Sequence, residues 1–224
     1  MRTFLRENSL TIVFALLFVG ALVGQAFAGW AEHNNQQLAS GLDPLSLGQY
    51  VTSATFAVDV TENWQSEYLQ FLFYIFATVW LVQRGSPESK ELGKEGIESD
   101  KDQLIGKYAR PDSPAWARVG GWRTTLFSRS LGLTMGAIFV ASWLVQSVAG
   151  WAAFNEEQLK QLLDPLPWLG YLTSADFWSR SLQNWQSEFL AVGSMAVLSI
   201  YLRQRGSPES KPTGSAHGDT GITG

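Results

Sequence analysis

The sequence predicts an all-α integral membrane protein, a four-helix bundle built from two tandem-duplicated transmembrane helical hairpins whose outer loops contain short helices. Two observations predict this fold. Residues 10–30 and 131–151 carry no charged side chain, and each could cross a hydrocarbon core of ~30 Å as a helix. The pentapeptide NWQSE occurs at residues 63–67 and again at 184–188, an offset of 184 − 63 = 121.

The similarity extends well beyond NWQSE. Residues 30–90 and 151–211 are identical at 29 of 61 ungapped positions, including the octapeptide QRGSPESK that ends both segments. Because this period is far longer than that of a stacked repeat, the similarity predicts two copies of one small structural unit.

We therefore divide the chain into four parts. They are repeat one (1–90), a charged linker (91–121), repeat two (122–211) and a disordered tail (212–224). Each repeat is predicted to contain two membrane helices, at about 10–30 and 65–83 in repeat one and at about 131–151 and 186–203 in repeat two.

The distribution of cations predicts the orientation. Residues 31–66 contain no Lys or Arg, and residues 152–187 contain only Lys160 and Arg180. The remaining cations lie near the two termini and around the linker. Because an excess of Lys and Arg marks the cytoplasmic side, both termini and the linker are predicted to be cytoplasmic, and the two NWQSE loops to face outward.

The first apolar run also fits a cleavable secretory signal, because Arg2 and Arg6 precede it and Ala26-Phe27-Ala28 follows. The equivalent stretch of repeat two, which ends at Trp151, is internal and must be retained. We therefore expect the first helix to be retained as well.

Glycines in the first and third predicted helices have the spacing that permits close contact between membrane helices. They are Gly20-x-x-x-Gly24 and Gly132-x-x-x-Gly136, which do not occupy equivalent positions in the repeats. Packing inside the chain and a dimer face both fit this spacing.

NWQSE is predicted to begin the second helix of each repeat, because Asn is a good N-cap and a Glu in the first turn favours the positive helix end. Tryptophans are enriched at membrane interfaces. We expect four of them at the outer interface: Trp30, Trp64, Trp151 and Trp185.

The position of the NWQSE glutamates suggests a second role. The apolar run after Glu188, residues 189–202, would span only about 21 Å as a helix. An acid this close to the membrane should face the bundle and have a partner. We predict a candidate polar cluster formed by Gln25, Gln65, Glu67, Gln146, Gln186 and Glu188. The alternative is that NWQSE only starts the helices.

Other chemistry is scarce. The chain has no cysteine and two histidines, and it lacks metal-ligand spacing, a phosphate-binding loop and a nucleophile motif. We therefore predict no catalytic, cofactor or metal site and no nucleic-acid partner.

The chain resembles an uncharacterised bacterial family of integral membrane proteins that is classed as a domain of unknown function. The resemblance rests on Arg6-Glu7-Asn8-Ser9-Leu10, the GQxFAGW-like end of the first helix, the LGxY-L-x-S loop, QRGSPESK and the N-W-x-S-E-F motif. The second copy, with Phe189, matches the last motif better than the first, with Tyr68. The resemblance covers nearly the whole chain except the linker and tail. It implies four helices in the bacterial inner membrane and no established activity.

We expect a non-enzymatic, multi-pass inner-membrane protein that is structural or accessory to a membrane complex. Its expected partners are the lipid bilayer and either a membrane protein or further copies of itself. The alternative is a small transporter or channel that uses the polar cluster around Glu67 and Glu188. Few polar residues in the inner halves of the first and third helices weigh against this alternative.

Overall fold

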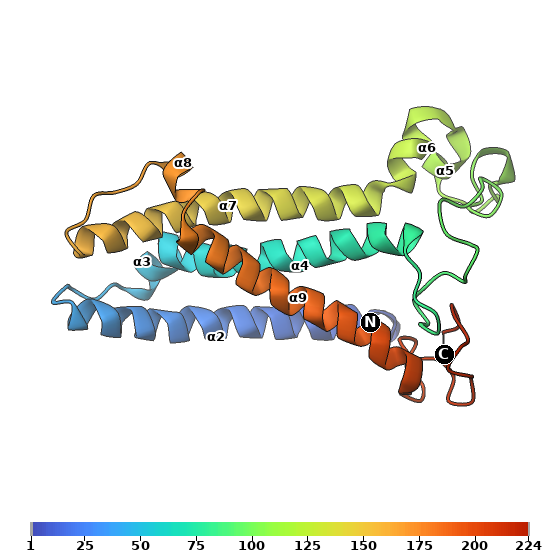
Figure 1. Ribbon diagram of the computed structural model, residues 1–224, viewed down its shortest axis with the longest axis horizontal. Helices are drawn as coiled ribbons and strands as arrows, with labels where there is room; N and C mark the ends of the chain where they lie inside the picture. The colour runs from blue at the N-terminus through green and yellow to red at the C-terminus, as the bar shows by residue number, and fades with distance from the viewer. Residues whose placement is uncertain (1, 224) are drawn as a thin grey trace. The chain divides into compact units, whose positions relative to one another are not determined.

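The computed structural model describes residues 2–223. Within this range the chain consists of helices joined by irregular segments, and no strand is present (Figure 1). The all-α prediction is confirmed. The long helices are α2 (Ser9–Ala39), α4 (Ala54–Trp80), α7 (Ser130–Lys160) and α9 (Ala175–Tyr201). The short ones are α1 (Arg2–Glu7), α3 (Leu47–Val51), the 3-10 helix η1 (Gly106–Tyr108), α5 (Ala115–Val119), α6 (Gly121–Ser128) and α8 (Trp168–Tyr171).

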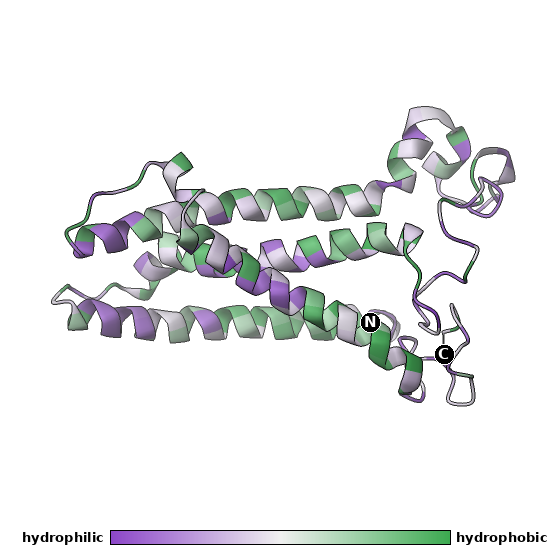
Figure 2. Ribbon diagram, in the orientation of Figure 1, coloured by the Kyte–Doolittle hydropathy of each residue, from purple (hydrophilic) through white to green (hydrophobic). Residues whose placement is uncertain are grey.

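Two of these helices, α2 and α7, are long and apolar enough to cross a membrane. Figure 2 shows α2 as hydrophobic along most of its length, with hydrophilic residues gathered toward its C-terminal end. The other two long helices, α4 and α9, lack an apolar stretch of that length, because NWQSE and several charged residues occupy their N-terminal halves. The structure thus identifies two candidate spans where the sequence analysis predicts four.

Both candidate spans continue as helices well beyond the predicted ends, by 39 − 30 = 9 residues in α2 and 160 − 151 = 9 in α7. The added residues, 31–39 and 152–160, contain neither Gly nor Pro and are rich in the helix formers Ala, Glu, Gln and Leu. Much of each predicted outer loop is therefore helix.

The same chain reversal ends both helices. Gly41 and Leu162, which are equivalent at the 121-residue offset, adopt φ values of 73° and 59°. The next backbone N–H then bonds to a carbonyl of the last turn, from Leu42 to Gln37 at 2.9 Å and from Leu163 to Gln158 at 2.8 Å. This is a Schellman-type end, and repeat two forms it without the glycine that normally permits a positive φ.

The described chain divides into two compact units. Unit 1 comprises the residues up to Thr61 together with Val145–Leu172, and unit 2 comprises Glu62–Leu144 together with the residues from Thr173 onward. Because the boundaries fall inside helices, α4 and α7 each contribute to both units.

In unit 1, a tryptophan near the end of each apolar run holds the following loop. The indole N–H of Trp30 donates to the Leu45 carbonyl at 2.7 Å, and that of Trp151 donates to the Leu166 carbonyl at 2.6 Å. These two predicted interfacial residues therefore fix loop geometry, whatever solvent surrounds them.

An asparagine one turn further along each helix forms hydrogen bonds with the backbone of the same leucine. Asn34 and Asn155 each donate to the leucine carbonyl at 2.9 Å, and each accepts from the leucine N–H, at 2.8 and 2.9 Å. The loop backbone at this point is thus hydrogen-bonded in the same way in both repeats.

In each repeat, a buried tyrosine also packs against the long helix of unit 1. Tyr50, in α3, and Tyr171, in α8, are 2% and 0% exposed. Each hydroxyl lies against a helix glycine, Gly29 for Tyr50 and Gly150 for Tyr171. The short helices predicted in the outer loops are therefore present. Each one places a tyrosine ring against the long helix that precedes it.

The helices α4 and α9 begin at serine caps. The hydroxyl of Ser53 accepts from the Phe56 N–H, and that of Ser174 accepts from the Phe177 N–H, both at 3.2 Å. Each serine starts a long helix, because no proline follows within α4 or α9 and the helix continues without interruption.

In unit 2, α7 packs closely on α4 through its two glycines. A Cβ built at Gly132 would lie 3.0 Å from the Phe76 ring, and one at Gly136 would lie 3.5 Å from Leu72. Within unit 1, by contrast, no atom lies within 4 Å of a Cβ built at Gly20 or Gly24. Of the two glycine pairs, only the one in α7 packs inside its own unit.

We predict that Gly29→Ala and Gly150→Ala each destabilise the protein by about 1–3 kcal/mol, because the added methyl would overlap the hydroxyl of Tyr50 or Tyr171. Gly193→Ala is the matched control, since it makes the same change in an open part of α9 and carries the same gain in helix propensity. Thermal unfolding in one detergent measures all three variants, and equal midpoints for Gly29→Ala and Gly193→Ala would contradict the packing role of Tyr50.

Candidate functional site

NWQSE lies inside α4 and α9 and does not start them. Asn63 is residue 63 − 54 + 1 = 10 of α4, and Asn184 is residue 184 − 175 + 1 = 10 of α9. The prediction that NWQSE begins the second helix of each repeat is wrong, because the helices already begin at the Ser53 and Ser174 caps. The motif therefore has to be explained by what its side chains contact on the helix surface.

The two copies of NWQSE contact each other in unit 2, and the best-defined contact is a hydrogen bond from Trp185 to Gln65. The indole N–H of Trp185 donates to the side-chain oxygen of Gln65 at 2.8 Å, and the Gln65 amide donates to the Glu62 carbonyl at 3.0 Å. Gln65 is 0% exposed. A buried amide with both ends bonded joins α4 to α9 at this point.

The equivalent residues of the motif have different surroundings. Gln186 is exposed although Gln65 is buried, and Trp64 is exposed although Trp185 is half-buried. The Trp185–Gln65 bond therefore joins a half-buried tryptophan of repeat two to a buried glutamine of repeat one.

The glutamates of the motif differ in the same way. Glu188 is half-buried and its carboxylate hydrogen-bonds to the Ser66 hydroxyl, while Glu67 is exposed and close enough to Glu188 for their charges to interact. Ser66 in turn donates to the Asn63 carbonyl at 2.8 Å. Four members of the predicted cluster, Gln65, Glu67, Gln186 and Glu188, thus lie in unit 2, where one amide and one carboxylate form inter-helix bonds.

The other two predicted members, Gln25 and Gln146, lie in unit 1. Gln25 is half-buried in α2, and Gln146 is 1% exposed in α7. The role of the six residues as one functional cluster stays a prediction.

An ion pair that the sequence analysis missed joins α4 and α9 one turn before Gln65. The Arg180 guanidinium contacts the Glu62 carboxylate at 3.1 Å and the Asp176 carboxylate at 3.4 Å. At the 121-residue offset, Arg180 corresponds to Asp59, so the two repeats carry opposite charges at this position. That reversal was the signal available in the sequence.

An aromatic cluster surrounds Trp143 of α7. Its ring lies 5.7 Å from that of Phe139, 6.0 Å from that of Phe177 and 6.0 Å from that of Trp185, with Trp178 at 6.2 Å. Such pairs contribute about 0.5–1.5 kcal/mol each beyond the apolar area that they bury. Trp185 therefore acts as a packing residue between α7 and α9 in unit 2.

Repeat one has smaller side chains at two positions of this cluster. The positions equivalent to Trp143 and Trp178 are Leu22 and Ala57, so two of the large rings are missing from repeat one. The interfacial aromatic role remains a prediction for Trp64, whose exposed ring suits it best.

QRGSPESK forms the same turn after α4 and after α9. The Ser89 hydroxyl accepts from the Gln83 N–H at 2.8 Å, and the Ser210 hydroxyl accepts from the Gln204 N–H at 2.9 Å. A glycine with positive φ sits inside each turn, Gly85 at 86° and Gly206 at 84°. The motif is therefore required by backbone geometry in both copies.

The lysine that ends each motif organises the residues that follow. Lys90 donates to the Gly96 carbonyl and pairs with Glu98, which lowers the pKa of the Glu98 carboxyl. Lys211 donates to the carbonyls of Ala216, His217 and Asp219 at 3.0–3.1 Å. Because Gly96 and His217 are equivalent at the same offset, the structural repeat extends beyond the region of sequence identity.

The C-terminal tail, expected to be disordered, has specific partners up to Gly221. The Gly85 N–H donates to the Thr220 hydroxyl at 2.8 Å, and the Gly221 N–H donates to the Ser86 carbonyl at 3.0 Å. A Cβ at Gly85 would overlap the His217 carbonyl. The tail thus packs on the turn of repeat one.

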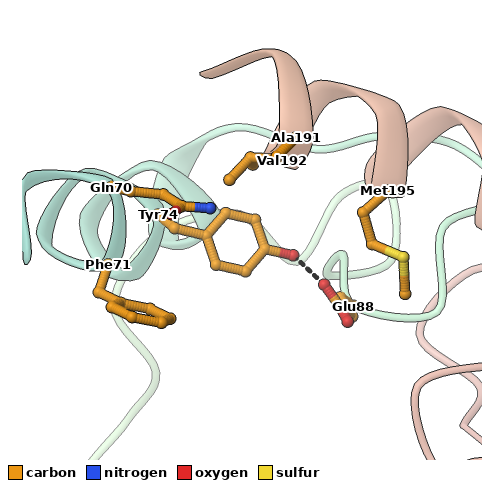
Figure 3. Close-up of a pocket in the computed structure, with 7 residues that line it drawn as sticks. All are labelled: Gln70, Phe71, Tyr74, Glu88, Ala191, Val192 and Met195. Carbon is orange, nitrogen blue, oxygen red and sulfur yellow. Dashed lines mark hydrogen bonds between the residues drawn. The ribbon is translucent and has the colours of Figure 1, made fainter. Parts of the chain in front are cut away.

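A small cavity lies between α4 and α9, next to the first QRGSPESK turn (Figure 3). Its volume is about 210 Å³, and it is lined by Gln70, Phe71, Tyr74, Glu88, Ala191, Val192 and Met195. The Tyr74 hydroxyl donates to the Glu88 carboxylate, as the dashed line in Figure 3 marks. The lining therefore combines apolar side chains with three polar ones, Gln70, Tyr74 and Glu88.

Glu88 is the acid that lines the cavity, whereas the equivalent Glu209 is exposed and lies outside the lining. Glu209, which corresponds to Glu88 at the 121-residue offset, hydrogen-bonds its carboxyl to that of Glu88. This hydrogen bond, followed by the negative charge of Glu88, raises the pKa of the Glu209 carboxyl. Sequence reasoning missed the pair, although its signal was the acid inside a duplicated turn.

Among residues 2–223 no three His, Cys, Asp or Glu side chains converge as a metal site would require. The polar contacts described above are hydrogen bonds and ion pairs.

Comparison with known families gives one match. A model described as a domain of unknown function, DUF6766, covers residues 1–222. The chain belongs to the DUF6766 family. This agrees with the resemblance to an uncharacterised family. The DUF6766 match spans both repeats, the linker and nearly all of the tail. No curated protein and no solved structure matches the chain.

The asymmetry of NWQSE predicts different costs for the same substitution in the two copies. Gln65→Leu removes the buried amide that accepts from the half-buried Trp185 N–H and should cost about 1–3 kcal/mol. Gln186→Leu, on an exposed side chain in the same motif, should change stability by less than about 0.5 kcal/mol. Unfolding in one detergent compares the two, and equal losses would contradict the Trp185–Gln65 contact.

Proposed function

We propose that the protein is a non-enzymatic integral membrane protein of the bacterial inner membrane, structural or accessory to a membrane complex, with both termini in the cytoplasm. The observation that supports this most is α2. It contains a stretch of 18 residues that is apolar enough to cross a bilayer and is 0% buried.

An uncovered helix of this kind is unfavourable in water. Leu10, Phe14 and Leu17 of α2 are 72%, 63% and 62% exposed. Exposed apolar surface costs about 25 cal/mol per Å², and soluble monomers rarely expose a continuous patch of this extent. Lipid or a neighbouring membrane helix is the natural cover.

The repeat supports two further spans. In the proposed topology α4 and α9 return to the cytoplasm through their apolar C-terminal halves, and both QRGSPESK turns lie on that side. Arg84 and Arg205 in those turns agree with an excess of cations on the cytoplasmic side. Tandem duplication of one hairpin then accounts for the equal contacts in the two copies.

The glycines of α2 suggest where a partner helix packs. In α7 the equally spaced pair Gly132 and Gly136 accepts Phe76 and Leu72 of α4, whereas Gly20 and Gly24 have no neighbour within unit 1. We propose that the Gly20/Gly24 face of α2 packs against a helix of another subunit, since small residues allow membrane helices to approach closely.

Transport through a polar cluster around Glu67 and Glu188 has weaker support. The side chains of Glu67 and Gln186 are exposed, whereas those of Gln65 and Glu188 bond between helices in unit 2. We therefore favour the structural role.

Reporter fusions test the topology. A phosphatase, active only outside the cytoplasm, should be active when inserted after Asp43 or Asp164 and inactive after Gly85 or at the C-terminus. A cytoplasmic reporter at the same positions should give the opposite pattern. An active phosphatase at the C-terminus would overturn the proposed four spans.

Site-specific photocross-linking tests the partner face. The chain has no cysteine, so Phe27→Cys creates a unique thiol. At 3.6 residues per turn, Phe27 lies on the Gly20/Gly24 side of α2 and Ala15 on the opposite side. In intact membranes, Phe27→Cys labelled with benzophenone-maleimide should give an adduct larger than the monomer. Gly20→Leu with Gly24→Leu should abolish that adduct.

Ala15→Cys with the same label is the matched control and should give far less of the adduct. An adduct that runs at monomer mass would show that α2 packs inside its own chain, and it would overturn the proposed partner face.

A further inference from the structure

The helices α5 and α6 form a hairpin directly before the candidate span α7 (Figure 1). Thr124 of α6 is buried, and its hydroxyl donates to the Trp116 carbonyl of α5 at 2.6 Å. The large apolar residues of the hairpin are exposed instead: Trp116, Val119, Trp122, Leu126 and Phe127. A small hydroxyl thus faces inward and the apolar side chains face outward, which reverses the amphipathic pattern of a helix on the surface of a water-soluble protein.

Two glycines at the turn bring these apolar side chains together. Gly120 and Gly121 adopt φ values of 73° and 66°, so the chain reverses sharply between α5 and α6. The ring centroids of Trp116 and Trp122 then lie 6.2 Å apart. At 3.6 residues per turn, Leu126 lies on the same side of α6 as Trp122. The two indoles and Leu126 therefore form one exposed apolar surface, which we call the hairpin face.

The charges on the hairpin are all positive. Residues 114–130 contain Arg118, Arg123 and Arg129 and no acid. Within residues 2–223 no carboxylate forms an ion pair with any of these arginines. The Arg123 guanidinium lies 5.6 Å from the centroid of the Trp122 ring, beside the hairpin face. Because the planar guanidinium matches the geometry of a phosphate group, an apolar face with such neighbours is complementary to an anionic lipid surface.

The hairpin is tied to the end of a candidate span. The helix α6 ends at Ser128 and α7 begins at Ser130. With 8 residues, α6 is about 12 Å long, so all of it lies within about that distance of the first turn of α7. In the proposed topology this end of α7 is cytoplasmic. The hairpin face is therefore within reach of the headgroups of the cytoplasmic leaflet.

Repeat one has a counterpart of α6 in the same place. The short helix α1 ends at Glu7, two residues before the start of α2, just as α6 ends two residues before the start of α7. At the 121-residue offset, Thr3 corresponds to Thr124 and Leu5 to Leu126. Leu5 is exposed, as Leu126 is. A short helix with an exposed leucine thus precedes both candidate spans, which favours a role for it at the membrane surface.

We propose that the α5–α6 hairpin lies in the headgroup region of the cytoplasmic leaflet and binds anionic phospholipid. The hairpin face enters the boundary between headgroups and acyl chains, and Arg118, Arg123 and Arg129 contact the lipid phosphates. The inference rests on the proposed membrane role of α7, and it names the class of lipid that surrounds the cytoplasmic end of that span.

Lipid-borne quenchers test this contact in the full-length protein. The chain has no cysteine, so Leu126→Cys can carry a unique NBD fluorophore on α6. The protein is reconstituted in vesicles of equal parts phosphatidylcholine and phosphatidylglycerol, with a doxyl quencher near the top of the acyl chains of one lipid or the other. We expect labelled phosphatidylglycerol to quench at least about fivefold more strongly than labelled phosphatidylcholine, a factor equivalent to about 1 kcal/mol for one arginine near an anionic surface.

Ser128→Cys with the same fluorophore is the matched control for position. Ser128 is exposed and lies on the side of α6 opposite Leu126. Both lipids should quench a label at Ser128 far less than one at Leu126, because that side of the helix faces away from the bilayer.

A pair of charge variants tests the arginines. Arg118→Gln with Arg123→Gln should remove most of the preference for phosphatidylglycerol, while quenching by both lipids persists because the hairpin face is intact. Lys101→Gln with Lys107→Gln removes the same charge from the linker and should leave the preference unchanged. Raising the salt from about 0.1 M to about 1 M shortens the Debye length from ~10 Å to ~3 Å. It should therefore reduce the preference in the chain with all its arginines, which serves if the arginine variant fails to fold.

Absence of quenching at residue 126 by either lipid would show that the hairpin face lies in water or under protein, and it would overturn the proposal. Equal quenching by the two lipids would leave only an apolar anchor and would overturn the recognition of anionic lipid. The topology is read separately. An active phosphatase after Gly85 would overturn the cytoplasmic position itself, whereas an inactive one combined with no quenching at residue 126 would overturn the hairpin inference alone.

Discussion

The first turn of α4 and of α9 sets the register on which the rest of the structure depends. A serine hydroxyl accepts the N–H three residues later, and the helix that follows contains no proline to stop it. Had these helices begun at NWQSE, side chains of the motif would have capped the N–H groups of the first turn. Because they begin earlier, Gln65, Trp185 and Glu188 project from the middle of a helix and can bond across to its neighbour.

The copies of the repeat have kept the contacts that hold each one together and changed those that join them. Trp30 and Trp151 bond to their loops alike, and the QRGSPESK turns close with the same serine bond. The contacts between the copies, by contrast, involve residues that differ between the repeats. Arg180 stands where repeat one has Asp59, and it pairs with Glu62. Two identical surfaces would have repelled each other at that position, whereas the diverged ones attract.

Sequence patterns anticipated what is local and periodic. The all-α class, the apolar runs of α2 and α7 and the short helices in the outer loops all follow from composition and spacing. The ends of α2 and α7 and the starts of α4 and α9 did not, because good helix formers continue through segments that look like loops. The Glu88–Glu209 pair and the Trp143 cluster required the fold, since their members lie far apart in the sequence and each is unremarkable alone.

The seating of the tail on the first QRGSPESK turn has a consequence for biogenesis. Gly85 and Thr220 are 135 residues apart, and Lys211 donates to the carbonyls of residues that follow all four long helices in the chain. The Gly85 N–H therefore has no Thr220 hydroxyl to bond while those helices are being synthesised. A chain interrupted before Thr220 would leave this N–H without that partner and the surface of the Gly85 turn uncovered.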